Sequence, residues 1–234
     1  MKRFGLFNVL FVLLIAFVLV NQDVIAREFN PDNYEVYLPT GIKSYVPRPV
    51  LFGFSPSGRG VELINIWQEA ADEYNCIIIS SNVIRNGMDI RHELSIIKED
   101  LNNHFAKEYP IDLNKIIAVG SSGGGMSSHM FSFFHPDTVA AVITNVGYIH
   151  ESTLKGENRK RYPHNKICAF IAGTTDYNYK LMQQDLKFLE KRDWTCKWIE
   201  FIGGHVWAPQ ESRKEALKFV LDELEKNEPV KVKF

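Results

Sequence analysis

The sequence predicts one α/β domain built on a mostly parallel central β-sheet with helices on both faces. Short runs rich in β-branched residues alternate along the chain with longer amphipathic segments, a pattern typical of repeated strand–helix units. The helical pattern is clearest near the carboxyl terminus, where one apolar stripe faces a row of Lys and Glu; the stripe consists of Ala216, Phe219, Val220 and Leu224. A length of 234 residues suits a single α/β domain.

The expected elements follow one another along the chain. Apolar runs predict strands at residues 34–39, 48–54, 76–81, 115–120, 139–145, 166–172 and 196–202. Amphipathic segments between them predict helices at residues 60–75, 90–108, 123–134, 178–192 and 211–226. Because ligands bind such sheets at the carboxyl ends of the strands, polar residues that directly follow a strand are the candidates for a functional site.

The strand expected at residues 115–120 leads into the most informative motif of the chain. Its apolar run is followed at residues 120–124 by Gly-Ser-Ser-Gly-Gly, and a helical pattern begins at once. This is G-x-S-x-G in a strand–turn–helix context, which exposes a serine hydroxyl at the end of the sheet. Only Ser122 has glycine two positions before and two positions after it, so Ser122 rather than Ser121 is the candidate nucleophile. The alternative is an ordinary strand–turn–helix corner.

A serine nucleophile needs a base, and on such a sheet the base comes last in the chain. His205 follows a predicted strand and two glycines, which let a loop fold the imidazole back over the end of the sheet. The alternative for His205 is a loop histidine beside a turn. The other histidines after the serine suit other places: His129 should point away with its helix, His135 should cap that helix, and His150 and His164 should lie on the surface.

The base needs an acid that orients it, and Asp176 is the candidate. It leaves the carboxyl end of the strand expected at residues 166–172, where a carboxylate can receive the histidine N–H and hold the tautomer. The alternative is a helix N-cap, because the next helix is expected to begin near Tyr179 and Asp is favoured at that position. Asp185 and Asp193 fall within or at the end of that helix and are expected to be solvated.

Three segments carry a family resemblance: residues 114–126, 172–179 and 201–209. They resemble the α/β-hydrolase superfamily, and within it the small lid-less esterases similar to dienelactone hydrolases, feruloyl esterases and polyhydroxybutyrate depolymerases. The resemblance spans roughly residues 34 to 226. It implies an α/β-hydrolase fold without a lid domain, with Ser122 as nucleophile, Asp176 as acid and His205 as base.

The oxyanion hole is the part of the expected site in which the chain departs from the family. One donor is expected to be the backbone N–H of Gly123. Many family members carry a His-Gly pair after the strand that supplies the second donor, but here residues 51–58 are Leu-Phe-Gly-Phe-Ser-Pro-Ser-Gly. The donor is a backbone N–H and Pro56 has none, which leaves Phe54 or Ser55.

These residues together predict a serine hydrolase that acts through an acyl-enzyme. The expected substrates are small-molecule or polysaccharide-linked carboxylic esters of the short-chain acyl, acetyl-sugar or feruloyl type. No metal or organic cofactor is implied, and 27 Lys and Arg against 28 Asp and Glu give no electrostatic footprint for nucleic acid. Two alternatives stay open: a secreted serine peptidase of the same fold, and a catalytically silent carbohydrate- or polymer-binding protein on a hydrolase scaffold.

Residues 1–26 are expected to be a signal peptide or membrane anchor, and residues 27–234 the catalytic domain. The chain begins Met-Lys-Arg, residues 4–20 are apolar apart from Asn8, and Val24 and Ala26 suit a signal-peptidase site. The apolar run is long for a signal and short for a membrane span of about 20 residues, so an uncleaved anchor is the alternative. In either case the domain is expected to be exported, in the periplasm or outside the cell.

Two further expectations concern the cysteines and the size of the substrate. The cysteines fall on predicted buried strands and are expected to be small buried hydrophobes; they are Cys76, Cys168 and Cys196. Residues 146–166 are polar and lack a long amphipathic pattern, so they should not form a helical cap over the site. An open site with little apolar wall would favour acetyl and butyryl esters over palmitoyl esters.

Overall fold

A mostly parallel β-sheet forms the centre of the computed structural model, which describes residues 27–40 and 46–226. Contacts group the chain from Pro31 onward into one unit; residues 27–30 belong to a separate unit and have no helix or strand. In the described residues the sheet has seven strands. Their order across the sheet is β1 (Tyr34–Tyr37), β3 (Ile77–Ser81), β2 (Arg48–Phe54), β4 (Ile111–Ser121), β5 (Ala141–Asn145), β6 (Ile167–Gly173) and β7 (Thr195–Phe201).

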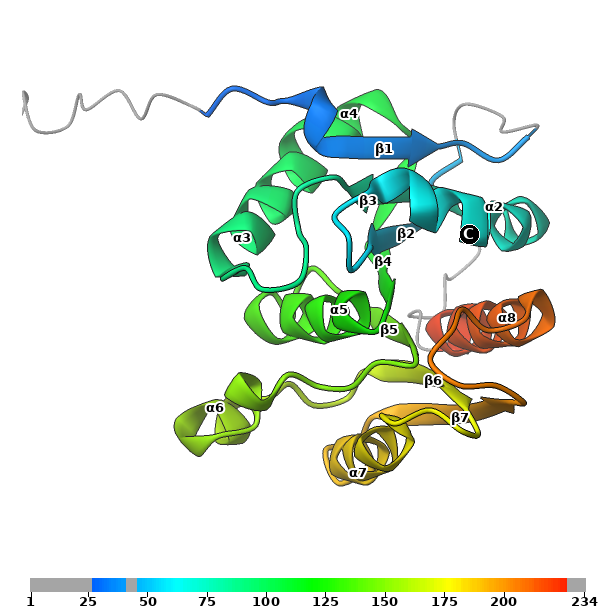
Figure 1. The fold of residues 1–234 in the computed structure, drawn as a ribbon. Helices are drawn as coiled ribbons and strands as arrows, with labels where there is room; N and C mark the ends of the chain where they lie inside the picture. Colours follow the sequence, from blue (N-terminus) through cyan, green and yellow to red (C-terminus); the bar gives the residue numbers. More distant parts are fainter. Residues whose placement is uncertain (1–26, 41–45, 227–234) are drawn as a thin grey trace, which may run out of the picture. The chain divides into compact units, whose positions relative to one another are not determined.

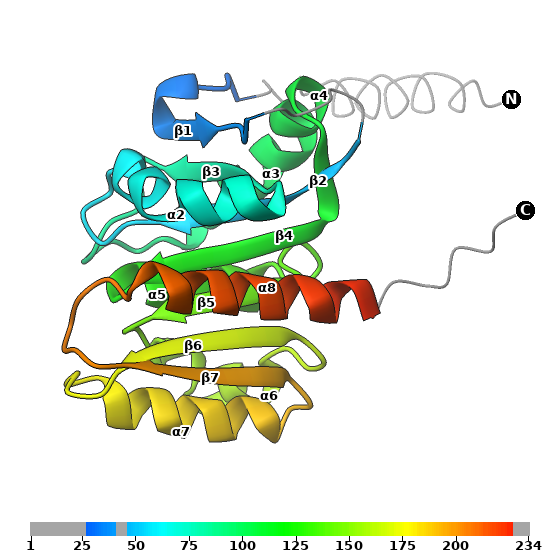
Figure 2. The same ribbon diagram turned by 90° about the vertical axis from the view of Figure 1, so that its right-hand side faces the viewer.

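The strands from β3 to β7 are parallel, and β1 at one edge runs antiparallel to β3. All residues of β3, β5 and β6 are buried, because helices cover both faces of the sheet. The prediction of a mostly parallel sheet is therefore confirmed. In Figure 2 the carboxyl ends of the parallel strands lie at the left, where the connecting loops gather.

Helices α2 (Gly60–Tyr74) and α8 (Gln210–Lys226) pack side by side on one face of the sheet (Figures 1 and 2). The apolar stripe of α8 joins the core of this face, in which Ala216 and Val220 are fully buried with Trp67 of α2. Helices α3 (Arg91–Asp100), α5 (Gly123–Phe134) and α7 (Tyr179–Glu190) cover the other face. The sheet therefore holds the N-terminus of α5 at its carboxyl edge, directly after β4.

The expected helix at residues 90–108 is interrupted. After α3 the chain makes a π-helical turn, Leu101–Phe105, and ends in the short helix α4 (Ala106–Glu108). At this turn Tyr34 of β1 donates its hydroxyl to Asp100 over 2.6 Å and meets the ring of Phe105 edge-on at 5.0 Å. Because the π-helical turn is wider than an α-helical one, Asp100 directly before it and Phe105 at its end contact the same tyrosine. The helical periodicity of the sequence did not reveal this tertiary contact.

The connection between β5 and β6 forms no lid domain. It holds only the 3-10 turn Glu151–Thr153 and the six-residue helix α6 (Gly156–Arg161), neither of which the sequence pattern had predicted. This confirms the expectation of a lid-less fold. Among the described residues no helix is long and apolar enough to cross a membrane. The predicted signal or anchor at residues 1–26 lies outside the described residues.

Two of the three cysteines are buried as expected. Cys76 and Cys168 are enclosed, whereas Cys196 on β7 is partly exposed, so the expectation of burial is wrong for Cys196. The reason is that β7 is the outer strand of the sheet, and most of its residues have some exposure. All three thiols are free.

Candidate active site

The turn between β4 and α5 holds Ser122 in an unusual backbone conformation. Ser122 has φ 53° and ψ −119°, a combination that L-residues other than glycine rarely adopt. The turn is tight enough to require glycine on either side. A Cβ atom on Gly120 would come within 2.3 Å of the carbonyl carbon of Gly124, and one on Gly124 within 2.0 Å of the oxygen of Phe54. The strain and the close packing together fix the direction in which the serine side chain leaves the sheet.

Ser121 and Ser122 have different surroundings. The hydroxyl of Ser121 is buried and accepts a hydrogen bond from Nδ2 of Asn145 over 3.0 Å. The Oγ of Ser122 lies 2.8 Å from Nε2 of His205. Ser121 therefore belongs to the packing between β4 and β5, and Ser122 is the serine that faces an imidazole.

His205 and Asp176 meet at the same edge of the sheet. Nδ1 of His205 lies 3.1 Å from Oδ2 and 3.3 Å from Oδ1 of Asp176, whose side chain is fully buried. Gly173, at the end of β6, allows this approach, because a Cβ atom there would come within 2.5 Å of the carbonyl oxygen of Gly204. The structure thus brings the three predicted side chains into one chain of contacts from carboxylate to imidazole to hydroxyl.

Asp176 also stabilises the loop that carries it. Its Oδ1 accepts the backbone N–H of Asn178 over 2.6 Å, and the side chain of Asn178 donates to the carbonyl of Val146 over 2.9 Å. The residue that precedes α7 is Asn178 rather than Asp176. Asp176 is therefore not the N-cap of α7. It accepts a hydrogen bond within the turn before that helix and contacts His205 as well.

Asn145 is a site residue that the sequence analysis missed. Its backbone carbonyl accepts the N–H of Ser122 over 2.9 Å. Its buried side chain donates to Ser121 and to the carbonyl of Val206, and accepts the N–H of Ala208 over 3.0 Å. One residue at the end of β5 therefore connects the serine turn to the loop of His205. Its position as the last, polar residue of an apolar strand was the only signal in the sequence.

The loop after β2 carries the two expected oxyanion donors, Phe54 and Ser55. Phe54 is still within the sheet, paired with Ser81 of β3 and Gly120 of β4. Ser55 is the first residue beyond the strand, and in the described chain no backbone partner accepts its N–H. The geometry therefore favours Ser55 over Phe54 as the second donor beside Gly123.

Glu62 on α2 holds this loop in place. Its Oε2 accepts hydrogen bonds of 2.6 Å from the hydroxyls of Ser55 and Ser57, and Arg59 pairs with its other oxygen. These hydrogen bonds lower the pKa of Glu62 to about 2, with the two serines as the largest causes. The carboxylate is therefore charged at neutral pH and binds the loop in its acceptor form.

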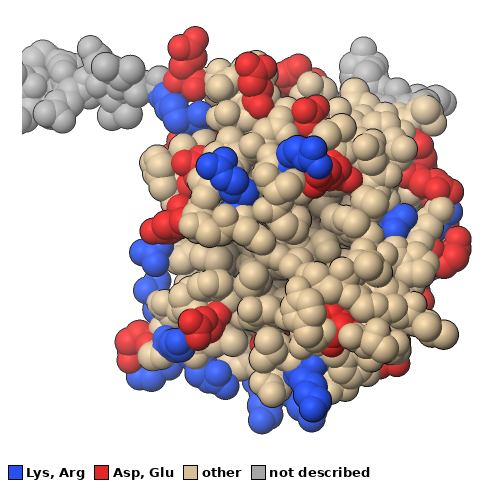
Figure 3. Space-filling view, in the orientation of Figure 1, with Lys and Arg blue, Asp and Glu red and all other residues tan. Residues whose placement is uncertain are grey.

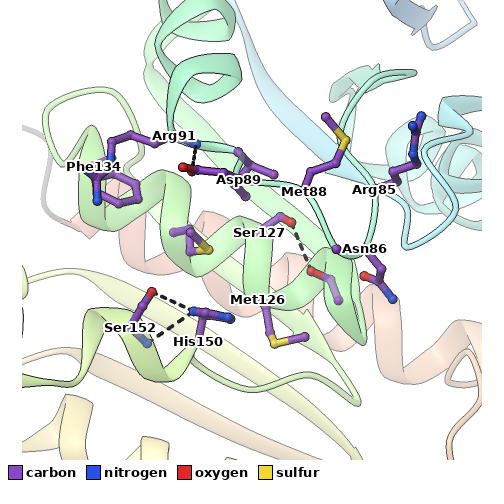
Figure 4. A pocket seen from close by; sticks show the side chains of 14 residues that line it. Arg85, Asn86, Met88, Asp89, Arg91, Met126, Ser127, Phe134, His150 and Ser152 are labelled. Atoms are coloured by element: carbon purple, nitrogen blue, oxygen red, sulfur yellow. Dashed lines mark hydrogen bonds between the residues drawn. The ribbon is translucent and has the colours of Figure 1, made fainter.

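A groove of about 650 Å³ opens beside Gly123. One wall is the segment 85–91, another is a row of side chains on α5, and His150 and Ser152 complete it (Figure 4). Much of the wall is apolar, formed by Met88, Met126, Met130 and Phe134. The expectation of an open site with little apolar wall is thus wrong for this side, because a helix already in the fold supplies the wall without any lid.

Tyr177 lies beside His205 and does not line the groove. Its ring stacks on that of His205, with centroids 4.3 Å apart and an interplanar angle of 24°. Although it contacts the imidazole, Tyr177 is 73% exposed. The side chains of Ile202 and Val206 in the neighbouring loop are also exposed. The histidine side of the site is therefore an open surface with an aromatic wall.

Among the histidines and aspartates expected outside the site, Asp185 is the one whose predicted environment is wrong; His129 points away from Ser122 as expected, and His150 is partly exposed. His129 is fully buried, within 3.2 Å of the Tyr162 hydroxyl, and burial lowers its pKa to about 3. His150 lines the groove. Asp185 is buried and accepts the N–H of Ile149 over 2.7 Å, and burial raises its pKa to about 7. The other expectations are confirmed, since His135 ends α5 and His164 and Asp193 are exposed.

Charged side chains are interspersed on the face shown in Figure 3. Lys, Arg, Asp and Glu lie mostly near its margin, and other residue types form most of its centre. Lys and Arg are more frequent along its lower margin, and Asp and Glu along its upper and right margins. This distribution agrees with the near balance of charges in the sequence.

The solved structures similar to this one include several esterases. Esterase PE8 aligns with a TM-score of 0.62 and 15% identity over 80% of this chain and 97% of its own. A thermophilic esterase from Thermogutta terrifontis, with propionate bound, aligns with a TM-score of 0.61 and 15% identity; the alignment covers 86% of this chain and 91% of the esterase. A ferulic acid esterase aligns with a TM-score of 0.61 and 17% identity, over 82% of this chain and 91% of its own. No protein-family model matches the sequence, and comparison with curated proteins gives no match. At these identities the likeness establishes the α/β-hydrolase fold.

Proposed function

We propose that this protein is an exported serine esterase that cleaves carboxylic esters through an acyl-enzyme. The observation that carries the proposal is the contact chain in which His205 lies 2.8 Å from the Oγ of a strained Ser122 and 3.1 Å from the buried Asp176. A hydroxyl, an imidazole and a carboxylate in this order are the groups that acyl transfer requires. The esterases of the same fold support the ester as the bond that is cleaved.

In the proposed reaction Ser122 attacks the ester carbonyl carbon while Nε2 of His205 takes its proton. The carboxylate of Asp176 accepts the Nδ1–H of the imidazole, which fixes the tautomer and stabilises the imidazolium. His205 then returns the proton to the oxygen of the leaving alcohol. Water attacks the acyl-enzyme with His205 again as the base, and the acid is released.

The negative charge of the tetrahedral intermediate needs donors on the side of the serine away from His205. We assign these to the N–H groups of Gly123 and Ser55, with Phe54 as the less favoured second donor. A single donor of this kind is typically worth about 10²–10³ in rate. Every group in this mechanism belongs to the chain itself, so it needs no metal or organic cofactor.

The proposed substrates are small-molecule or polysaccharide-linked esters of the short-chain acyl, acetyl-sugar or feruloyl type. The open histidine side, with no lid domain over it, supports access by a bulky alcohol. Export is proposed from the charged start and apolar run at residues 1–20, which favour the periplasm or the extracellular space, with membrane anchoring through residues 4–20 as the alternative.

A substrate panel tests the proposal. The purified protein is assayed with p-nitrophenyl acetate and butyrate, methyl ferulate, acetylated xylo-oligosaccharides and peptide p-nitroanilides. We expect ester turnover that Ser122→Ala lowers by several orders of magnitude and that Ser121→Ala largely retains, since the hydroxyl of Ser121 contacts Asn145 rather than His205. Turnover of peptides but no esters would contradict the proposal, as would equal activity of Ser122→Ala and wild type.

A further inference from the structure

Building on the proposed esterase activity, we propose that the groove along α5 binds the acyl part of the ester and selects acyl chains that end in a carboxylate. The groove begins at the backbone of Gly123, the proposed oxyanion donor, and ends at Phe134 and Arg91. Its substrate class would be monoesters of dicarboxylic acids with an extended apolar chain. Three features of the groove support this assignment: its position, its length and its charge.

The position of the groove relative to His205 assigns it to the acyl group. His205 must return a proton to the leaving oxygen, so the alcohol lies on the side of Ser122 that faces the imidazole. The groove lies on the other side: Gly123 lines it, whereas His205 and Tyr177 stand outside it. Once Ser122 is acylated, the carbon chain attached to the carbonyl is the part of the substrate that can extend along α5.

The length of the groove follows from helix geometry. Met126, Met130 and Phe134 lie four residues apart and therefore share one face of α5. Figure 4 shows Met126 and Phe134 on this helix beside the segment 85–91. With a rise of 1.5 Å per residue, Gly123 and Phe134 are about 16 Å apart along the helix. A chain of single bonds advances about 1.2 Å per bond when extended, so about thirteen bonds place a terminal group near Phe134. Methionine side chains adapt to such a chain.

The far end of the groove carries a guanidinium group suited to an anion. Arg91 lies over the ring of Phe134, with its Cζ 4.7 Å from the ring centroid. Stacking uses the face of the guanidinium and leaves its in-plane N–H donors available to a carboxylate. Among the described residues no carboxylate forms an ion pair with Arg91 or with Arg85, the second arginine of the groove.

Asp89 is the acidic residue of the groove lining, and it has a structural role. Its Oδ1 accepts the backbone N–H of Arg91 over 3.3 Å at the start of α3. The two arginines against this one carboxylate leave the lining with an excess of one positive charge. The apolar row near the serine and the cation at the far end together fit an acid that is apolar in its middle and charged at its end.

Matched ester pairs test this inference. The p-nitrophenyl monoesters of hexanedioic, decanedioic and tetradecanedioic acids are compared with p-nitrophenyl hexanoate, decanoate and tetradecanoate at low salt. We expect the ratio of kcat/KM, charged over neutral, to stay near one for the shortest pair and to reach about tenfold for the longest, a size typical of a partly exposed charge-assisted hydrogen bond. Arg91→Gln should return the longest pair to a ratio near one.

Arg161→Gln is the matched control, because it removes one positive charge from the exposed end of α6, outside the groove. It should leave all the ratios unchanged. The inference would be overturned if the charged-over-neutral ratio of kcat/KM were the same at every chain length, or if it fell equally in Arg91→Gln and Arg161→Gln. Either result would indicate long-range attraction of the anionic substrate by the protein's positive charges. A preference that appears only when the charge is placed on the alcohol of an acetate ester would also overturn the inference. Wild-type turnover of p-nitrophenyl acetate tests the proposed function separately, since that substrate does not reach Arg91.

Discussion

Replacing Asn145 should damage both the stability of the protein and its activity, although Asn145 lies behind the proposed reacting groups. Its side chain is fully buried and makes three hydrogen bonds, to Ser121, to the carbonyl of Val206 and to the N–H of Ala208. Asn145→Ala leaves these three groups without their partner. At about 1 kcal/mol for each lost bond, the free energy of unfolding should fall by about 3 kcal/mol.

The effect on activity follows from the position of two of these bonds. They hold the chain directly after His205, so their loss lets the imidazole move relative to the Oγ of Ser122. Since misplacement of a reacting group by about 1 Å can cost about 10²-fold in rate, we expect kcat/KM for p-nitrophenyl acetate to fall by about that factor. The assay is run at a temperature at which circular dichroism shows the variant to be folded.

Thr144→Val is the matched control for Asn145→Ala. Thr144 is the preceding residue of β5, and its buried hydroxyl has no hydrogen-bond partner among the described residues. Valine has nearly the same shape and removes that hydroxyl, so stability should stay equal or rise and kcat/KM should change little. The reasoning is refuted if folded Asn145→Ala keeps kcat/KM within twofold of wild type, or if Thr144→Val loses as much activity.

Substitutions at three other residues test the roles of the acid, the stacked ring and the buried carboxyl separately. Asp176→Asn should fold yet lose on the order of 10⁴ in kcat, because the wrong tautomer of His205 is held; wild-type kcat would reduce Asp176 to a turn residue. Tyr177→Ala should lower kcat/KM about two- to fivefold by removing the ring stacked on the imidazolium, whereas Tyr177→Phe should retain it; an equal loss in both would contradict stacking. The raised pKa of Asp185 means that its protonated form stabilises the fold below about pH 3.8, and that this stability is lost as the pH rises through about 7. Asp185→Asn should therefore unfold at higher urea concentration than wild type at pH 8, with a smaller difference at pH 5; a less stable variant at pH 8 would contradict this sign.

The sheet and most helices could be predicted from the sequence because their signals are local. The apolar runs are long enough to identify strands, and helix α5 was predicted with the bounds that the structure gives it. The candidate site could be predicted because each of its three side chains lies within four residues of the end of a strand, and parallel strands end at one edge of the sheet.

The burial of Asp185 had a signal that the sequence analysis overlooked. It lies three residues after Met182 and four before Leu189, which places it on the apolar stripe of α7, and all three residues are buried. A helical wheel would have found it. The links made by Asn145 and the groove between α5 and the segment 85–91 had no such signal, because they depend on which loops meet at the edge of the sheet.

Labelling with a fluorophosphonate probe shows directly whether Ser122 is an activated nucleophile, because the probe reacts with a serine only when a neighbouring base activates it. Wild type and Ser121→Ala are treated with the probe, digested and analysed by mass spectrometry beside Ser122→Ala. We expect one adduct on Ser122 in wild type and in Ser121→Ala, and no adduct in Ser122→Ala. An adduct on Ser121, or a wild-type protein that does not react, would contradict the claim that Ser122 and His205 form a working nucleophile and base.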